Sequence, residues 1–296
     1  MQLVTHIPSP PLSRFVAYLW WMRDTPEHTS ERVVPSGTLE LVVNLHEDEI
    51  GIYRAGTTRR QRYSGAVVSG AYRGYFVADP RAHTSIIGVH FKPGTAGPVL
   101  GLPPGELADR HVDLACLWGR AASELRERMC DAATPAERFA TLETILQSRL
   151  PARCTGHDAV PLALAQLAYP DATVREVAAR VNLSWRRLIE VFTAEVGMTP
   201  KRLQRVLRFQ RASEIARKSP TTDWARVAQL CGYFDQSHLI HDVRELTGLS
   251  PVQLAEASKR VKDHHVAVPE GSNLSNPRRS SVSSLSSCRT ACTARS

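Results

Sequence analysis

The sequence predicts an α+β protein in which a β-rich N-terminal domain precedes an all-α C-terminal domain. Three observations lead to this prediction. Short β-branched and aromatic runs occupy residues 1–113, and helical patterns take over from residue 114. A glycine, an apolar residue, a hydroxyl residue and a proline then follow one another twice, as GMTP at 197–200 and GLSP at 248–251. At 296 residues, with 43% hydrophobic and 22% charged residues, the chain is of ordinary globular composition and long enough for two domains.

The β-rich domain is expected over residues 1–113. The runs at 15–22, 38–45 and 84–91 are bounded by Pro, Gly and polar turn residues, as strands commonly are. Trp20 and Trp21 must face opposite sides of their strand. One therefore fills the core, and the other either also fills the core or lines an effector pocket or a dimer face.

A helical linker is expected over residues 114–158. Thr134-Pro135-Ala136-Glu137 is a capping box with proline at the first helical position. A further apolar helix at 161–169 begins the C-terminal domain, which we place at 159–257. Residues 258–296 are serine-rich, with seven basic against two acidic residues, and contain few large apolar side chains. They are predicted to be a disordered basic tail.

The C-terminal domain contains an internal repeat. Val177-Ala178 recurs as Val227-Ala228 fifty positions later, and Asn182 recurs as Gly232 at the same offset. After one inserted residue the offset is fifty-one, and it matches Leu188, Phe192, Gly197 and Pro200 with Leu239, Val243, Gly248 and Pro251. Each half reads as helix, tight turn, helix, and then a glycine stop followed by an N-cap hydroxyl and a proline. The sequence therefore predicts two tandem helix-turn-helix units with second helices at 184–195 and 235–246.

The segment between the two units predicts a connecting helix. KRLQRVLRFQRASEIARK would be about 27 Å long, so it could hold the two second helices about 34 Å apart, one turn of B-DNA. Its apolar positions form a stripe that should be buried: Leu203, Val206, Leu207, Ala212, Ile215 and Ala216. Residues 174–218 carry eleven basic and four acidic residues, a charge pattern that phosphates favour.

Residues 160–257 resemble the AraC/XylS family of bacterial transcription regulators. The resemblance rests on VGMTPKRLQRVLRFQRA and GYFDQSHLIHDVRELTGLSP. In the N-terminal part, WW at 20–21, VPSGTLELVVNL, GVHFKPGTAG and ELADRHVDL are similar to the sensor-type domain of one branch. The resemblance implies a cupin-like β-barrel for effector binding or dimerisation, followed by promoter-binding helices. Glu190 and His241 stand where the family often has arginine, and Val243 where it usually has phenylalanine, so no DNA sequence preference is carried over.

The N-terminal half of each second helix is expected to meet base edges. Arg186 suits guanine, Glu190 the cytosine amino group, Ile189 a thymine methyl and Gln236 adenine. The full set of base-contact candidates is Trp185, Arg186, Ile189, Glu190, Gln236, Ser237, Ile240 and His241. The phosphate candidates are Arg187, Lys201, Arg202 and Arg205. Two alternatives remain: these side chains are solvated helix residues, or the acidic second unit packs or binds DNA only loosely.

Arginine recurs every third residue along the connecting helix, at positions 202, 205, 208 and 211. On an α-helix this spacing drifts by about 60° per step, so the four side chains cannot all face one duplex. At least one of them is expected to be a structural surface residue.

The sequence contains no GxGxxG after a strand, no P-loop and no HExxH. We therefore expect no catalytic activity and no cofactor. The expected partner is double-stranded promoter DNA, with RNA polymerase, an unknown small-molecule effector and a second copy of the chain as further candidates. Two other functions stay open. One is an enzyme or metal-binding cupin that uses His83, His90 and Glu40, and the other is an interaction module whose basic face binds proteins or RNA.

The expected location is the cytoplasm, in association with the nucleoid. The N-terminus lacks the order of a signal peptide, and no run of about 18 apolar residues predicts a membrane span. The six cysteines show no CxxC pair, which favours free thiols in a reducing compartment.

Overall fold

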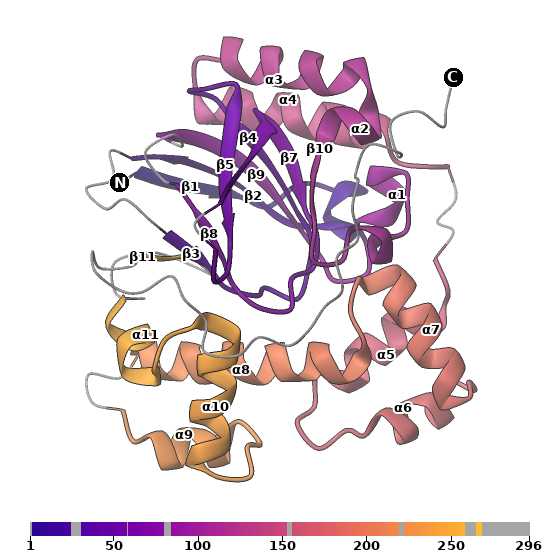
Figure 1. Ribbon diagram of the computed structural model, residues 1–296. Coiled ribbons are helices and arrows are strands. Elements are labelled where there is room, and N and C mark those ends of the chain that lie inside the picture. The colour runs from indigo at the N-terminus through magenta and orange to yellow at the C-terminus, as the bar shows by residue number, and fades with distance from the viewer. Residues whose placement is uncertain are drawn as a thin grey trace.

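The computed structural model describes residues 2–24, 31–57, 59–79, 84–152, 156–218, 222–257 and 265–267. Two antiparallel sheets form the N-terminal part (Figure 1). The six-stranded sheet has the order β1 (Gln2–His6), β2 (Val16–Arg23), β9 (Ser85–Phe91), β4 (Glu40–Asn44), β7 (Ala66–Ser69) and β10 (His111–Asp113). The second sheet has the order β11 (His265–Ala267), β3 (Glu31–Val33), β8 (Phe76–Ala78), β5 (Glu49–Arg54) and β6 (Arg60–Ser64).

The three strands expected from the apolar runs are β2, β9 and β4, which lie side by side in the six-stranded sheet. Trp20 and Trp21 are both buried on neighbouring positions of β2. Trp20 pairs with Gly88, and a Cβ built on that glycine would lie 2.4 Å from the indole ring. Trp21 belongs to the main hydrophobic cluster. Glycine at 88 therefore makes room for one indole, while the other packs into the core.

Strand β11 was not predicted, because it falls within the proposed tail. Val266 is buried, and His265 pairs with Val33 on β3. The edge of β3 offers backbone hydrogen bonds that even a polar segment can use. Apart from residues 265–267, the tail prediction lies outside the described residues.

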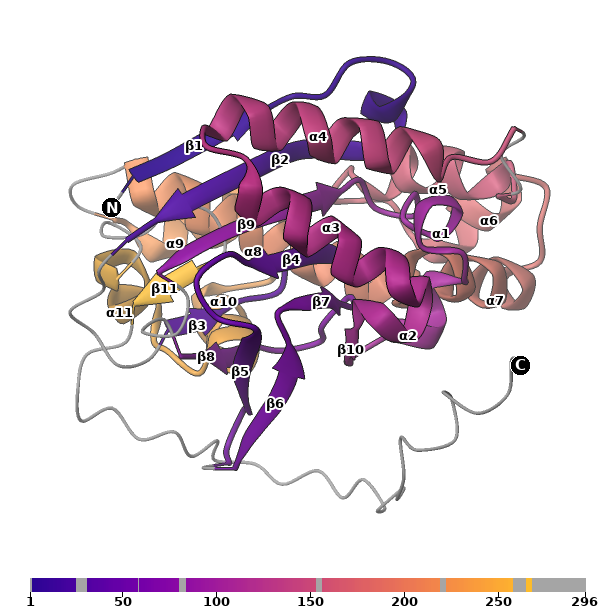
Figure 2. The same ribbon diagram turned by 90° about the horizontal axis from the view of Figure 1, so that it is seen from above.

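A layer of helices covers the six-stranded sheet (Figure 2). It consists of α2 (Leu114–Trp118), α3 (Arg120–Asp131) and α4 (Pro135–Ser148). The predicted capping box opens α4, where Glu137 N donates to Thr134 Oγ1 over 3.2 Å and Thr134 N donates to Glu137 Oε2 over 3.3 Å. Short helical turns connect the remaining strands: η1 (Leu12–Arg14), α1 (Gly97–Leu100) and η3 (Pro104–Leu107).

The C-terminal part is helical throughout. Its helices are α5 (Ala159–Leu167), α6 (Val174–Arg180), α7 (Trp185–Val196), α8 (Pro200–Lys218), α9 (Trp224–Leu230), α10 (Gln236–Thr247) and α11 (Pro251–Ala257). The pairs α6–α7 and α9–α10 lie toward the two ends of α8, and the sheets lie across α8 from α6 and α9 (Figure 1). The nineteen residues of α8 make it about 28 Å long.

The two halves of the internal sequence repeat have the same backbone conformation at their turns. Leu183 N donates to Ala178 O over 2.9 Å in the first turn, and Tyr233 N donates to Ala228 O over 2.9 Å in the second. Asn182 and Gly232 have φ angles of 56° and 74° in these turns. The inserted residue of the second turn is Phe234, whose exposed fraction is 93%.

Two hydrophobic clusters join the sheets to the helices. The larger cluster runs from the six-stranded sheet and α4 to Leu188, Phe192 and Val206. The second combines Val77 of β8 with Phe209 of α8 and side chains of α9, α10 and α11. Within the predicted stripe of α8, Leu203, Val206, Ala212 and Ala216 are buried and Leu207 and Ile215 are half-buried. Phe209 is a buried member that the sequence prediction omitted.

Candidate nucleic-acid interface

The first recognition helix, α7, exposes its N-terminal turn. Ser184 caps it by accepting from Arg187 N over 3.2 Å. Leu188 and Phe192 are fully buried against the rest of the domain. These contacts fix the rotation of α7 about its axis, and Trp185 is consequently 46% exposed.

The predicted base-reading side chains of α7 lie on this open face. Arg186 and Glu190 are exposed, and Ile189 is half-buried. The Arg186 guanidinium carbon lies 5.4 Å from the centre of the Trp185 ring. Arg187 Nη1 lies 2.9 Å from Glu190 Oε2, so the carboxylate partly neutralises a predicted phosphate contact on its own helix.

The second recognition helix, α10, has the same construction. Asp235 Oδ1 accepts from His238 N over 2.7 Å, and Leu239 and Val243 are buried. Of the predicted base contacts, Gln236, Ser237 and His241 are exposed and Ile240 is half-buried. His241 Nε2 lies 3.7 Å from Glu245 Oε2 one turn further along the helix.

Arg205, a predicted phosphate contact, binds carboxylates of α10. Its Nε lies 2.8 Å from Asp242 Oδ1, and its Nη2 lies 2.5 Å from Glu245 Oε2. The hydrogen bond with Glu245 raises the pKa of Arg205 and lowers the pKa of Glu245, as expected for an ion pair. Only 19% of the Arg205 side chain is exposed. The Arg205 guanidinium therefore links α8 to α10 through two carboxylates.

Asp242, which the sequence analysis did not single out, is 3% exposed. It lies on the inward face of α10, fifty-one positions after Val191, which is buried on α7. A carboxylate at a repeat position occupied by an apolar residue in the other unit is the signal that could have revealed a buried ion pair.

Of the other three arginines in this series, two contact protein groups and Arg202 is half-buried. Burial lowers the pKa of Arg202, and the nearby charges of Arg73 and Arg205 lower it further. Arg208 lies with its guanidinium carbon 5.3 Å from the Tyr233 ring centre, and Arg211 donates to Ala168 O. The drift around the helix, which the spacing predicted, thus brings Arg205, Arg208 and Arg211 to different neighbours. Lys201 and Arg187 are the phosphate candidates whose residues are exposed.

The C-terminal end of α7 lies against the β-rich domain. Gly197 ends the helix with a φ of 84°, and a Cβ built on it would lie 3.2 Å from both Ala71 Cβ and Pro104 O. A Cβ built on Gly105 of η3 would lie 2.8 Å from Thr193 O. These backbones are in direct contact, so η3 sets the position of α7 along its axis.

The C-terminal end of α10 meets the same domain through Arg32 of β3. Arg32 is 2% exposed, and its Nη1 donates to Thr247 O over 3.0 Å. Its guanidinium carbon lies 4.7 Å from the centre of the Tyr75 ring, and burial lowers its pKa. Gly248 ends α10 with a φ of 68°, and a Cβ there would lie 2.7 Å from the Tyr75 ring. GMTP and GLSP thus end their helices and also touch the β-rich domain.

The geometry offers little for metal chemistry. His90 Nδ1 lies 2.5 Å from Glu40 Oε1, but His83, the third residue of the alternative metal site, is outside the described residues. Among the residues that the structure describes, no three His, Cys, Asp or Glu side chains are grouped as metal ligands, and no helix is long and apolar enough to cross a membrane. The described cysteines are Cys116, Cys130 and Cys231, and no disulfide joins them.

Two protein families match separate parts of the chain, one in the β-rich part and one in the helical part. Residues 4–113 match a family described as domain of unknown function DUF6597. Residues 177–257 match a family described as helix-turn-helix domain. No curated protein matches the chain.

Several solved structures are similar at low identity. ToxT from Vibrio cholerae is 7% identical over 86% of this chain and 98% of its own, with a TM-score of 0.44. The C-terminal domain of AraT, a response regulator from Geobacillus stearothermophilus, is 20% identical over 40% and 95%, with a TM-score of 0.32. A transcriptional regulator with an AraC-type domain from Chromobacterium violaceum is 18% identical over 33% and 89%, with a TM-score of 0.31. These likenesses are too weak to carry a function to this chain.

The family match and the repeated helix-turn-helix geometry concern the same residues. Residues 177–257 are therefore a helix-turn-helix domain, and the protein is a DNA-binding transcription regulator.

Proposed function

We propose that the protein binds double-stranded promoter DNA with the N-terminal turns of α7 and α10 in successive major grooves. The observation that carries this proposal is the shared orientation of the two helices. In both, the first turn is open to solvent and the last turn is held against the β-rich domain. Their units lie toward the two ends of the 28 Å helix α8, a spacing close to the roughly 34 Å between grooves on one side of B-DNA.

In this proposal α7 makes the stronger base contacts. Arg186 pairs with guanine O6 and N7, Ile189 meets a thymine methyl and Glu190 accepts from cytosine N4. Trp185 packs beside them. Arg187 and Lys201 contact phosphates and set the register. Arg205 acts on DNA only indirectly, because its guanidinium group binds Asp242 and Glu245. Arg202, which is half-buried, is a further phosphate contact in this proposal.

The second unit contributes fewer favourable charges. Gln236 pairs with adenine N6 and N7, while Ser237, Ile240 and His241 complete the groove contact. Residues 222–257 carry Arg226 and Arg244 against Asp223, Asp235, Asp242, Glu245 and Glu256. We therefore assign most of the phosphate-dependent affinity to the first unit.

The β-rich domain would control DNA binding through the two helix ends that it touches. Binding to two grooves requires a particular distance between α7 and α10. The contacts of Gly105 with α7 and of Arg32 with α10 come from separate parts of this domain. A rearrangement between η3 and β3 would change the spacing of the two recognition helices and so the affinity for DNA.

Selection of bound duplexes from a random pool by the full chain tests this mode of binding. We expect two short half-sites whose centres are about 10 base pairs apart. Inserting either five or ten base pairs between them should abolish the gain in affinity from the second half-site, because α8 is long enough for only one turn of B-DNA. Equal affinity for all spacings, or for duplex DNA and RNA of the same length, would contradict the proposal.

The finer aspects of location and partners follow from the same proposal. A promoter-binding regulator would work in the cytoplasm on the nucleoid, without catalysis and without a cofactor. RNA polymerase and a second copy of the chain are its candidate protein partners. Sedimentation of the full chain with and without the selected duplex would show whether one or two copies bind.

A further inference from the structure

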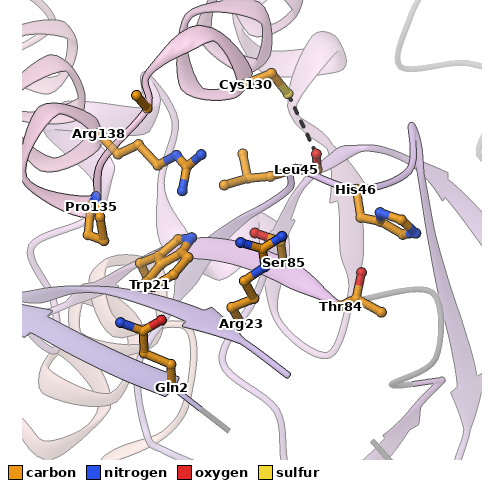
Figure 3. A pocket seen from close by; sticks show the side chains of 11 residues that line it. Gln2, Trp21, Arg23, Leu45, His46, Thr84, Ser85, Cys130, Pro135 and Arg138 are labelled. Carbon is orange, nitrogen blue, oxygen red and sulfur yellow. Dashed lines mark hydrogen bonds between the residues drawn. The ribbon is translucent and has the colours of Figure 1, made fainter. Parts of the chain in front are cut away.

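A cavity of about 400 Å³ opens where the six-stranded sheet meets the connection between α3 and α4 (Figure 3). It lies on the helix-covered face of the sheet. The lining residues come from β1, β2, the segment after β4, the start of β9, α3, α4 and the connection between α3 and α4. Those that carry its chemistry are Trp21, Arg23, Ser85 and Arg138. Its volume falls within the range of small-molecule sites.

Two guanidinium groups enter this cavity from different elements. Arg23 is the last residue of β2, and Arg138 lies in the first turns of α4 (Figure 3). Among the described residues, no Asp or Glu lines the cavity and no carboxylate lies within ion-pair distance of either arginine. The described part of the chain thus places two positive charges around one space, with no negative charge paired to either.

The surroundings of Arg138 disfavour the charged form of its guanidinium group. Its Nε donates to Met129 O over 3.1 Å, which anchors the side chain at the cavity wall. Burial lowers the pKa of Arg138, and the charge of Arg23 lowers it further. Glu137, whose charge acts in the opposite direction, uses its carboxylate to accept from Ala133 N and Thr134 N at the start of α4.

Trp21 adds a buried donor to the two charged groups. The residue is 4% exposed, and its Nε1–H has no acceptor among the described residues. The indole also lies beneath Arg138, whose guanidinium carbon is 5.5 Å from the ring centre. A buried N–H without an acceptor is costly and uncommon in folded proteins, and ligand oxygens are one remedy.

We propose that this cavity binds a small organic dicarboxylate. Each guanidinium group can hold one carboxylate through paired N–H donors, and two such groups on separate walls match a ligand with two acidic ends. The Ser85 hydroxyl and the Trp21 indole N–H add neutral donors on the same lining. Trp21, Leu45 and Pro135 give the space between the charges an apolar boundary.

The proposal deepens the proposed function, because a ligand here would act as the effector of the regulator. Trp21 belongs to the same continuous hydrophobic cluster as Phe139 of α4 and Leu188 and Phe192 of α7. A ligand that moves α4 against the sheet would therefore act on the cluster that positions the first recognition helix.

Isothermal titration of the full chain with succinate, glutarate and phthalate tests the site without reference to DNA. We expect one of them to bind in a one-to-one complex, and glutaramide, the uncharged counterpart of glutarate, not to bind. Arg23→Gln and Arg138→Gln should each weaken binding by at least about tenfold, since each removes a charged pair. Arg120→Gln, at an exposed position of α3, should leave binding unchanged.

Arg23 is exposed, so its variant should fold even if that of Arg138 does not. The proposal fails if none of the three dicarboxylates binds better than glutaramide, or if binding survives in Arg23→Gln. It also fails if inorganic phosphate binds as tightly as every dicarboxylate. DNA binding by unliganded Arg23→Gln, measured in parallel, separates a failure of this site from a failure of the proposed function.

Discussion

The two helix-turn-helix units share a backbone but differ in what holds them and in what they present. Their turns make equivalent hydrogen bonds, and both second helices end at a glycine with positive φ. On the inward face, α7 has Val191 where α10 has Asp242. On the outward face, α7 begins with Trp185 and Arg186 and α10 with Gln236 and Ser237.

The comparison shows that two units can share a backbone conformation without sharing their stabilising contacts or their DNA-contacting side chains. The backbone of a helix-turn-helix unit depends on turn residues, caps and a few apolar contacts, which both halves contain. The stability and the DNA contacts of each unit depend on side chains that diverged independently. Both units pack through apolar clusters. The first unit also contacts the η3 backbone, whereas the second adds the polar contacts of Arg205 and Arg32.

The largest expected effect concerns the buried ion pair of the second unit. Arg205→Met would leave Asp242 buried without its charged partner, which typically costs about 3–5 kcal/mol of the free energy of unfolding. Adding Asp242→Val, which copies Val191 of the first unit, should recover much of this loss. Urea unfolding of the two variants provides the comparison. A single variant as stable as the parent protein would show that the two units are held alike.

The second effect concerns DNA affinity. Arg186→Ala should weaken binding to the selected duplex by about 1–3 kcal/mol and relax the preference at one base pair. Gln236→Ala should cost less, because the acidic second unit adds less to binding. Competition titrations with single-base variants of the duplex measure both quantities. Similar losses for all sequences in both variants would remove the assignment of base-reading roles.

The contact of Arg32 with the end of α10 predicts a local change. Arg32→Met keeps much of the side-chain volume but removes the donor to Thr247 O and the charge beside Tyr75, at a cost of about 1–3 kcal/mol. Hydrogen exchange should become faster at the C-terminal end of α10 and in α11, while the amides of α7 keep their protection. Equal acceleration in both recognition helices would indicate that the β-rich domain does not hold them separately.

The smallest effect is a pH dependence confined to the second unit. The pKa of Glu245 is lowered by its hydrogen bond with Arg205, so this group stabilises the fold above its ordinary pKa. The contribution is lost as the pH falls through and below that value. Because half of the Glu245 side chain is exposed, we expect at most about 1 kcal/mol. Unfolding of the parent protein and of Glu245→Gln between pH 7 and acidic pH measures the difference. A steeper acid loss in Glu245→Gln would reverse the assignment.

The sequence predicted the elements that depend on residues close together in the chain, and it missed an element that depends on a distant partner. The apolar runs predicted β2, β4 and β9, because strand formation follows side-chain pattern and turn residues along a few positions. Strand β11 was missed, since its three residues have no pattern of their own and depend on the free edge of β3. Predicted base contacts on α7 and α10 lie on open faces, and whether they read bases stays a prediction.

The arginines of α8 show where such reasoning stops. Their three-residue spacing indicated that they point in different directions, because helix geometry is local. It could not indicate that Arg205 binds Asp242, or that Arg211 reaches Ala168. A long side chain selects its partner from groups that only the packed fold brings within reach.

The amino-acid sequence alone determined where this chain turns and how its helices begin and end. Asn182, Gly232, Gly197 and Gly248 adopt positive φ, and Thr134 and Ser184 cap helices, because those conformational energies depend on the residue and its near neighbours. Only the tertiary structure decided that β3 and η3 hold the two recognition helices, and that Arg23, Arg138 and Trp21 surround one cavity. Such contacts join segments far apart in the chain, and their energies exist only once packing has brought the groups together.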